Sequence, residues 1–253
     1  MGIVLRSEDE IARIGRAGEV VARVLDAVEA ACVPGVTTRE LERIAARELA
    51  AAKGESVYIG YAPGGAPPYP SVLCTSINEE VVHGIPSGRA LREGDVIGID
   101  FACAKDGWVA DGARTIGVGV VSAAARGLVD KTRAALDAAI ERAVVGARLG
   151  DLGDAISRVA GGSGIVRAFT GHGVGRRMHE PPAVPNVGRA GTGTRLKAGL
   201  VIAIEPMFTL GSGDVEIADD GWTVKTIDRS WAAHYEHTIA ITARGPRVLT
   251  SRT

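Results

Sequence analysis

Hydrophobic residues recur at helical spacing in two segments near the start of the chain. The first segment begins at a capping box formed by Ser7 and Glu10 and stops near Cys32. Its apolar positions are Ile11, Ile14, Val21, Val24, Leu25 and Val28. Thr37 and Glu40 form a second capping box. The pattern therefore predicts a long helix followed by a shorter one.

The spacing then changes to that of strands. Residues 72–82 and 96–120 are rich in Val, Ile and Thr and are interrupted by Gly and Pro. A long helical pattern returns from Ser122, and Asp151 begins a shorter helix that ends at GGSG, residues 161–164. Further runs typical of strands are 165–169, 200–204, 222–227 and 237–242. The order long helix, short helix, strands thus occurs twice.

A weak internal repeat agrees with this order. PGVTTREL at 34–41 aligns with VGARLGDL at 145–152 at a constant offset of 111 residues. We therefore expect a single domain, residues 1–253, built from halves of about 1–121 and 122–253. An active site would then lie where the halves meet.

Composition and charge exclude several classes of protein. The chain is 46% hydrophobic and 23% charged with a net charge of −1, so it has no basic footprint for nucleic acid or an anionic membrane. No apolar run approaches about 18 residues, and the first residues lack the pattern of a signal peptide. Three cysteines without C-x-x-C spacing favour reduced thiols: Cys32, Cys74 and Cys103. We expect a soluble, cytoplasmic protein.

Two aspartates lie on neighbouring strands of a predicted hairpin. In VIGIDFACAKDGWVADGARTI (96–116), strand-forming runs flank Asp106-Gly107, a preferred two-residue turn. With that turn, position i pairs with position 213 − i, so Asp100 and Asp111 share one face about 7–8 Å apart. A three-residue loop would put the two aspartates on opposite faces. Taken singly, either aspartate could equally be a turn or helix-cap residue. Two buried neighbouring aspartates repel each other unless a proton or cation lies between them, which favours a divalent metal.

The second half contains further candidate ligands. Glu205 ends an apolar run in VIAIEPMF, and Glu236 begins another in HYEHTIAI. GHGVGRRMHEPP (171–182) holds His172 and His179, and its glycines and Pro pair argue against a regular helix. An oxygen-rich set with one imidazole suits two adjacent ions such as Mn²⁺, Fe²⁺ or Co²⁺ better than one structural zinc. That set is Asp100, Asp111, His172, Glu205 and Glu236.

Six motifs follow one another over nearly the whole chain: NEEVVHGIP (78–86), IDFACAKDGWVADGART, GHGVGRRMHEPP, IEPM, DGWTVKT (220–226) and YEHT. In them the sequence resembles the type I methionine aminopeptidases. The resemblance implies the α+β pita-bread (creatinase/aminopeptidase) fold, in which pseudo-twofold duplicated halves form a curved antiparallel sheet covered by helices. It also implies a metal-dependent aminopeptidase that removes the initiator methionine from nascent proteins and peptides when the second residue is small.

The same resemblance implies a dinuclear metal centre. Asp100 would chelate one ion, and Asp111 and Glu236 would bridge the two. His172 and Glu205 would complete the other position. The two divalent ions would be Co, Mn, Fe, Zn or Ni. The expected partner is the N-terminal methionine of nascent peptides, with transient ribosome contact, a monomeric state, no nucleic acid specificity and no membrane.

Catalytic and pocket residues also follow from the resemblance. His83 and His179 would bind the substrate around the scissile amide, and Glu205 would relay the proton of the attacking water. His234 and His237 are interpreted as ordinary core or surface histidines, although either could contact a metal-ligating side chain. The methionine pocket would be lined by residues for which ordinary core packing is the competing explanation: Tyr61, Tyr69, Cys74, Met178 and Trp222.

The sequence departs from the expected family pattern at two places. YAPGGAPPYP (61–70) is longer than the family's usual loop, and Met178 replaces an aromatic residue, so the substrate range can differ.

Three alternative functions are considered. One is a Xaa-Pro aminopeptidase or prolidase, which usually has an additional N-terminal domain, whereas this chain has only a short segment before its first helix. Another is a metal-free peptide-binding pita-bread module, which would have lost ligands. A nucleotide site is disfavoured because GHGVGR and GRAGTGTR do not match G-x-x-x-x-G-K-[ST].

Overall fold

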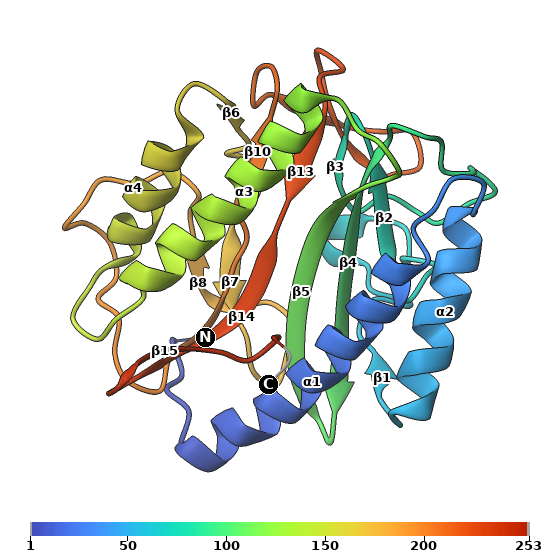
Figure 1. The fold of residues 1–253 in the computed structure, drawn as a ribbon. Helices are drawn as coiled ribbons and strands as arrows, with labels where there is room; N and C mark the ends of the chain where they lie inside the picture. The colour runs from blue at the N-terminus through green and yellow to red at the C-terminus, as the bar shows by residue number, and fades with distance from the viewer. Residues whose placement is uncertain (1, 252–253) are drawn as a thin grey trace.

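Four helices lie against one face of a curved antiparallel sheet in a computed structural model that describes residues 2–251 (Figure 1). The helices are α1 (Glu8–Ala30), α2 (Thr38–Ala51), α3 (Ala123–Arg142) and α4 (Leu149–Ala160), with a short 3₁₀ turn at Pro63–Gly65. The long α1 and α3, one from each half of the chain, lie apart in the view, with β5 and β14 visible between them. None of the helices within residues 2–251 combines the length and apolar character needed to cross a membrane.

The helix starts follow the predicted caps, with one difference. Ser7 and Thr37 cap α1 and α2 through complete capping boxes, and Ser122 caps α3. Asp151 does not begin α4. The helix starts two residues earlier, and the Asp151 carboxylate accepts a hydrogen bond of 2.6 Å from the N–H of Arg148. Asp151 thus satisfies a free N–H of the first turn from inside the helix.

The strands form one large sheet and two small ones, and all their pairings are antiparallel within the described residues. The large sheet has the order β1-β4-β5-β14-β9-β7-β8, with β2 also on β4 and β15 also on β14. The small sheets have the orders β13-β10-β6 and β11-β12-β3. The strands are β1 (Glu55–Ser56), β2 (Cys74–Ile77), β3 (Glu80–Val82), β4 (Val96–Lys105), β5 (Trp108–Gly117), β6 (Gly164–Ile165), β7 (Gly171–Gly173), β8 (Glu180–Val184), β9 (Val201–Ile204), β10 (Met207–Thr209), β11 (Val215–Ile217), β12 (Val224–Thr226), β13 (Ala232–His234), β14 (Glu236–Thr242) and β15 (Gly245–Val248).

The β4–β5 hairpin has the predicted register. Asp106 and Gly107 form its two-residue turn with φ of 51° and 72°, the left-handed region that such a turn requires. Asp100 pairs with Ala113, and Asp111 pairs with Ala102. The two aspartates therefore share one face. The strand expected over 165–169 is mostly wrong: β6 ends at Ile165, which pairs with Phe208 of β10, and Phe169 lines a cavity instead.

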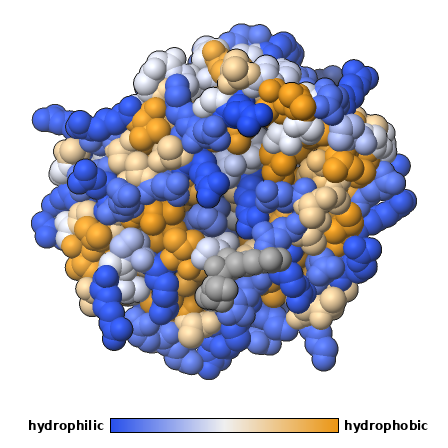
Figure 2. All heavy atoms as spheres, viewed as in Figure 1, coloured by the Kyte–Doolittle hydropathy of each residue, from blue (hydrophilic) through white to orange (hydrophobic). Residues whose placement is uncertain are grey.

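The two repeat segments have matching local geometry. Gly35 and Gly146 have φ of 93° and 94° and donate backbone hydrogen bonds to Leu91 and Leu196. The turns at 34–41 and 145–152 thus enter α2 and α4 in the same way. Two large apolar clusters accompany these units, one under α1 and α2 and the other under α3 and α4. On the helical face, apolar side chains are scattered among polar ones (Figure 2).

Candidate active site

A cavity of about 310 Å³ brings together residues from both halves of the chain. All the residues expected as metal ligands, substrate histidines and pocket walls line it. They are Asp100, Asp111, His172, Glu205, Glu236, His83, His179, Tyr61, Tyr69, Cys74, Met178 and Trp222. Four further residues that were not among the predicted site residues also line it: Tyr58, Pro63, Phe169 and Thr170. Phe169 and Thr170 directly precede the GHG segment, which is the signal that could have identified them.

The carboxylates and one imidazole are the innermost groups. Asp111, His172 and Glu236 are buried, and each offers a ligand atom within 4.8 Å of the others. His172 Nε2 also lies 3.6 Å from Glu205 Oε1. Asp100 is linked to Asp111 through the Tyr58 hydroxyl, which contacts both carboxylates at 2.6 and 3.2 Å. Donors that are far apart in sequence therefore converge at one place.

Glycines allow His172 to reach this position. A Cβ added at Gly171 would lie 2.3 Å from the Ala203 carbonyl oxygen, and one at Gly173 would lie 2.3 Å from that of Pro181. Both contacts are with backbone, which has little freedom to move. The glycine-rich segment is thus a strand, β7, packed between β9 and β8 too closely for side chains beside the histidine.

Burial and mutual repulsion strongly perturb these carboxyl groups. Burial, with a smaller opposing effect of the Tyr58 hydrogen bond, raises the pKa of Asp100 to about 6. Burial and then neighbouring carboxylates raise the pKa values of Asp111, Glu205 and Glu236 well above their usual range. These pKa values are those of the metal-free protein, in which no cation offsets the charge of the ionised carboxylates.

The donor set fits divalent metal ions. The Glu236 Oε1 atom is buried and has no hydrogen-bond partner among the described residues. His172 Nδ1 lies 3.0 Å from the carbonyl oxygen of Gly173, so Nδ1–H donates there and Nε2 keeps its lone pair. Burial first, and then His179, lowers the pKa of His172 to about 3, which keeps the imidazole neutral. An unpartnered carboxylate oxygen and a free imidazole nitrogen are what a metal ion would use.

The two other cavity histidines flank this cluster. The His179 ring lies 4.3 Å from the His172 ring, centroid to centroid, and its Nδ1 lies 2.7 Å from the Tyr61 hydroxyl. His83 has φ of 61°, a conformation uncommon for non-glycine residues, and its ring stands edge-on to Trp222 at 6.1 Å. The histidines of GHGVGRRMHEPP therefore face one cavity.

The remaining histidines lie outside the cavity lining. His234 is buried with Nε2 3.8 Å from Glu205 Oε2, so it lies directly behind a candidate ligand. Burial and the neighbouring His83 lower its pKa to about 3. His237 forms a hydrogen bond of 2.8 Å with the Thr250 hydroxyl. The sequence alone did not show which of His234 and His237 lies next to a candidate ligand, because both are within two residues of Glu236.

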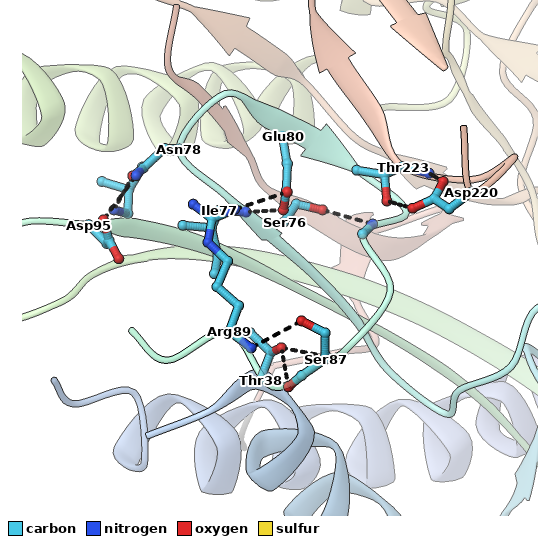
Figure 3. A network of polar contacts seen from close by, with 12 residues as sticks. Thr38, Ser76, Ile77, Asn78, Glu80, Ser87, Arg89, Asp95, Asp220 and Thr223 are labelled. Carbon is cyan, nitrogen blue, oxygen red and sulfur yellow. Dashed lines mark hydrogen bonds and ion pairs between the residues drawn. The ribbon is translucent and has the colours of Figure 1, made fainter. Parts of the chain in front are cut away.

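Polar contacts outside the cavity hold the segment from β2 through β3 that leads to His83 (Figure 3). Glu80 accepts a hydrogen bond of 3.1 Å from Arg89, and its other oxygen accepts one from the backbone at the end of β2. Thr38, in the first turn of α2, accepts a hydrogen bond of 2.7 Å from the N–H of Ser87. These contacts join the segment around β2 and β3, and the residues that follow it, to α2.

Comparison with known proteins places this site in a family. The sequence model of metallopeptidase family M24 matches residues 12–243. The chain belongs to this family. The M24 chain is 43% identical over 251 residues to the methionine aminopeptidase of Clostridium acetobutylicum, with 98% of each chain covered. It also superposes on the crystal structure of the methionine aminopeptidase from Thermotoga maritima with a TM-score of 0.95 and 38% identity, over 99% of this chain and 100% of that one.

The M24 chain shares its fold with more distant peptidases. Prolidase from Pyrococcus furiosus gives a TM-score of 0.78 at 22% identity, covering 99% of this chain and 66% of that one. Identity at this level shows the fold alone. The pita-bread architecture expected from the motifs is thereby confirmed, and the M24 chain is much closer to the methionine aminopeptidases.

Proposed function

We propose that this M24 chain removes the N-terminal methionine from peptides and nascent proteins when the second residue is small. The observation that carries the proposal is the convergence of four carboxylates and three imidazoles from both halves on one cavity with an apolar wall. Similarity to methionine aminopeptidases over nearly the whole chain supports the same activity. In this proposal residues 1–253 act as one catalytic domain, because both halves supply the site.

Two divalent ions are proposed to be held by Asp100, Asp111, His172, Glu205 and Glu236. Four carboxylates carry the charge that two such ions neutralise. Burial first, and then the charges of neighbouring carboxylates, raise the pKa values of three of them well above the usual range. The ions are of the Co, Mn, Fe, Zn or Ni type, which accept mixed oxygen and nitrogen ligands. Bound there, they supply Lewis acidity and make hydroxide available near neutral pH.

Glu205 is proposed as the group that moves the proton. It would accept a proton from the attacking water and deliver it to the departing amine nitrogen. Its carboxylate lines the cavity with the other candidate ligands, 3.6 Å from His172 Nε2, so it would lie next to the reacting water. His234 lies behind Glu205 and limits its rotation.

His179 and His83 are proposed to hold the scissile amide. His179 would donate a hydrogen bond to the carbonyl oxygen as negative charge develops there, and His83 would bond near the leaving nitrogen. Burial lowers the pKa values of both, that of His83 to about 4, so both rings are neutral at pH 7. A neutral ring keeps one N–H for this purpose without adding a charge.

The apolar wall is proposed to bind the methionine side chain. Aromatic rings and sulfur atoms pack well against a thioether. The wall consists of Tyr61, Tyr69, Cys74, Met178 and Trp222, with Phe169 added by the structure. The Trp222 indole N–H donates a hydrogen bond of 2.7 Å to the carbonyl of Pro67, so the long 61–70 loop is tied to the wall. We further propose that the chain acts as a cytoplasmic monomer, in transient contact with ribosomes.

The proposal is tested with the chelator-treated protein reloaded with Mn²⁺. We expect hydrolysis of Met-Gly-Ser that depends on the added metal, together with a much slower reaction on Ala-Pro. Preference for the proline dipeptide would favour a prolidase instead. Metal-independent binding of Met-Gly-Ser without cleavage would favour a peptide-binding module.

A further inference from the structure

Tyr58 lies two residues after the short strand β1 and places its hydroxyl between two candidate ligands. The hydroxyl lies 2.6 Å from Asp100 Oδ1 and 3.2 Å from Asp111 Oδ1. The Tyr58 side chain is buried, and its ring packs edge-on against Tyr69 at 5.9 Å between centroids. The Ser56 hydroxyl accepts a hydrogen bond of 3.3 Å from the Tyr58 N–H, which fixes the turn. The phenol is therefore held in place from both its backbone and its ring.

A phenol has a single hydrogen to donate. The shorter contact assigns this hydrogen to Asp100. No other group within residues 2–251 forms a hydrogen bond with the Asp100 carboxylate. The rotation of this carboxylate about its last bond is therefore restrained by Tyr58, whereas Asp111 has additional contacts with its surroundings.

We propose that Tyr58 is a positioning residue that orients Asp100 and so sets the affinity of the metal position which Asp100 serves. The inference rests on the proposed function, because it takes Asp100 to be a ligand. Tyr58 was not among the residues that the sequence motifs indicated. It belongs to the segment before the 61–70 loop, where the chain departs from the usual family pattern.

Two effects of the hydroxyl oppose each other. A hydrogen bond draws electron density from the carboxylate and weakens it as a ligand, whereas a fixed orientation lowers the entropy lost on binding. Removal of partners that hydrogen-bond metal ligands typically costs about 10–100-fold in metal affinity. The orienting effect therefore dominates, and loss of the hydroxyl weakens metal binding.

The test compares Mn²⁺ affinities measured by competition with a chromogenic chelator. Tyr58→Phe is expected to bind Mn²⁺ about 10-fold more weakly than the parent. Tyr235→Phe is the matched control, because its hydroxyl donates to the backbone carbonyl of Thr115 at 2.8 Å and the residue does not line the cavity. This control is expected to keep its Mn²⁺ affinity within about twofold, since it removes the same group without touching a carboxylate.

Two further measurements separate positioning from packing. The melting temperature of metal-free Tyr58→Phe should fall by only about 3–6 °C, because the ring is retained and one hydrogen bond is lost. Ser56→Ala, which loosens the turn and keeps the phenol, should weaken Mn²⁺ binding in the same direction. Unchanged affinity in Tyr58→Phe, or equal losses in Tyr58→Phe and Tyr235→Phe, would overturn the inference. A parent protein that binds no Mn²⁺ would instead refute the proposed function.

Discussion

The Tyr61 hydroxyl lies 2.7 Å from Nδ1 of His179, which is 118 residues away in the sequence. When the phenol donates this hydrogen bond, the imidazole keeps its own hydrogen on Nε2. Tyr61 begins the 61–70 loop. This loop therefore contacts a histidine that is proposed to stabilise the reaction.

Tyr61→Phe is expected to lower kcat for Met-Gly-Ser by about 10-fold, a fraction of the 10²–10³-fold that loss of a donor to the oxyanion costs. KM should change less, because the aromatic wall is kept. Steady-state kinetics with saturating Mn²⁺ measure both constants. In a His179→Ala background the same change should cause little further loss, since Tyr61 acts through that ring. An equal loss in both backgrounds would show that Tyr61 acts independently of His179.

Asp111→Asn is expected to stabilise the metal-free protein at neutral pH. Burial first, and then the charge of Asp100, raises the pKa of Asp111 well above the value of about 4 that an unfolded chain shows. The folded form thus holds a proton that the unfolded form has released. The contribution of Asp111 to stability is complete below about pH 4 and is lost as the pH rises toward the folded pKa.

The measurement is the difference in melting temperature between Asp111→Asn and the parent, both metal-free, from pH 4 to pH 7. Each pKa unit corresponds to about 1.4 kcal/mol, or roughly 4 °C for a chain of this size. The difference should grow in favour of the variant as the pH rises. Mn²⁺ should reverse the order at pH 7, because only the parent retains the full ligand set. A difference that is independent of pH would contradict the prediction.

Arg6→Ala is expected to destabilise the fold by about 3 kcal/mol or more, because it leaves the buried Glu180 charge without its partner. The Arg6 and Glu180 side chains are 8% and 9% exposed, and Glu180 also accepts hydrogen bonds from the N–H groups of Arg176 and Arg177. Since Glu180 follows His179, kcat should fall as well. Urea denaturation and kinetics measure the two effects.

The pair of Arg229 with Glu216 provides the control for this prediction. These side chains are 57% and 45% exposed, and exposed pairs contribute about 0–1 kcal/mol. Arg229→Ala should therefore leave the free energy of unfolding nearly unchanged. Equal losses in Arg6→Ala and Arg229→Ala would refute the structural role of the buried pair.

Gly173→Ala is expected to reduce both stability and Mn²⁺ affinity. The added Cβ would lie 2.3 Å from the Pro181 carbonyl oxygen, so β7 must shift, and His172 with it. Such overpacking costs about 1–3 kcal/mol. Gly127→Ala is the control, since Gly127 lies exposed in α3 with nothing near its added Cβ. That change should stabilise the helix by about 0.5–1 kcal/mol, and calorimetry distinguishes the two signs.

The sequence by itself determined the features that depend on neighbouring residues. The Ser7–Glu10 box starts α1, and the Asp106-Gly107 turn alone fixes the register that places Asp100 and Asp111 on one face. Caps and two-residue turns are closed by hydrogen bonds within a few positions, so a local pattern is sufficient. The motifs also supplied the five candidate ligands and the fold, through their resemblance to a family.

Only the tertiary structure decided which distant groups meet. Tyr58 reaches Asp100, Tyr61 reaches His179, and His234 lies behind Glu205, and no local pattern indicated these contacts. They depend on the curvature of the sheet and on how its two halves pack together. Spacing along a chain determines the face of a strand on which a side chain lies, whereas the partner opposite that face is set by the packing of segments far apart in the sequence.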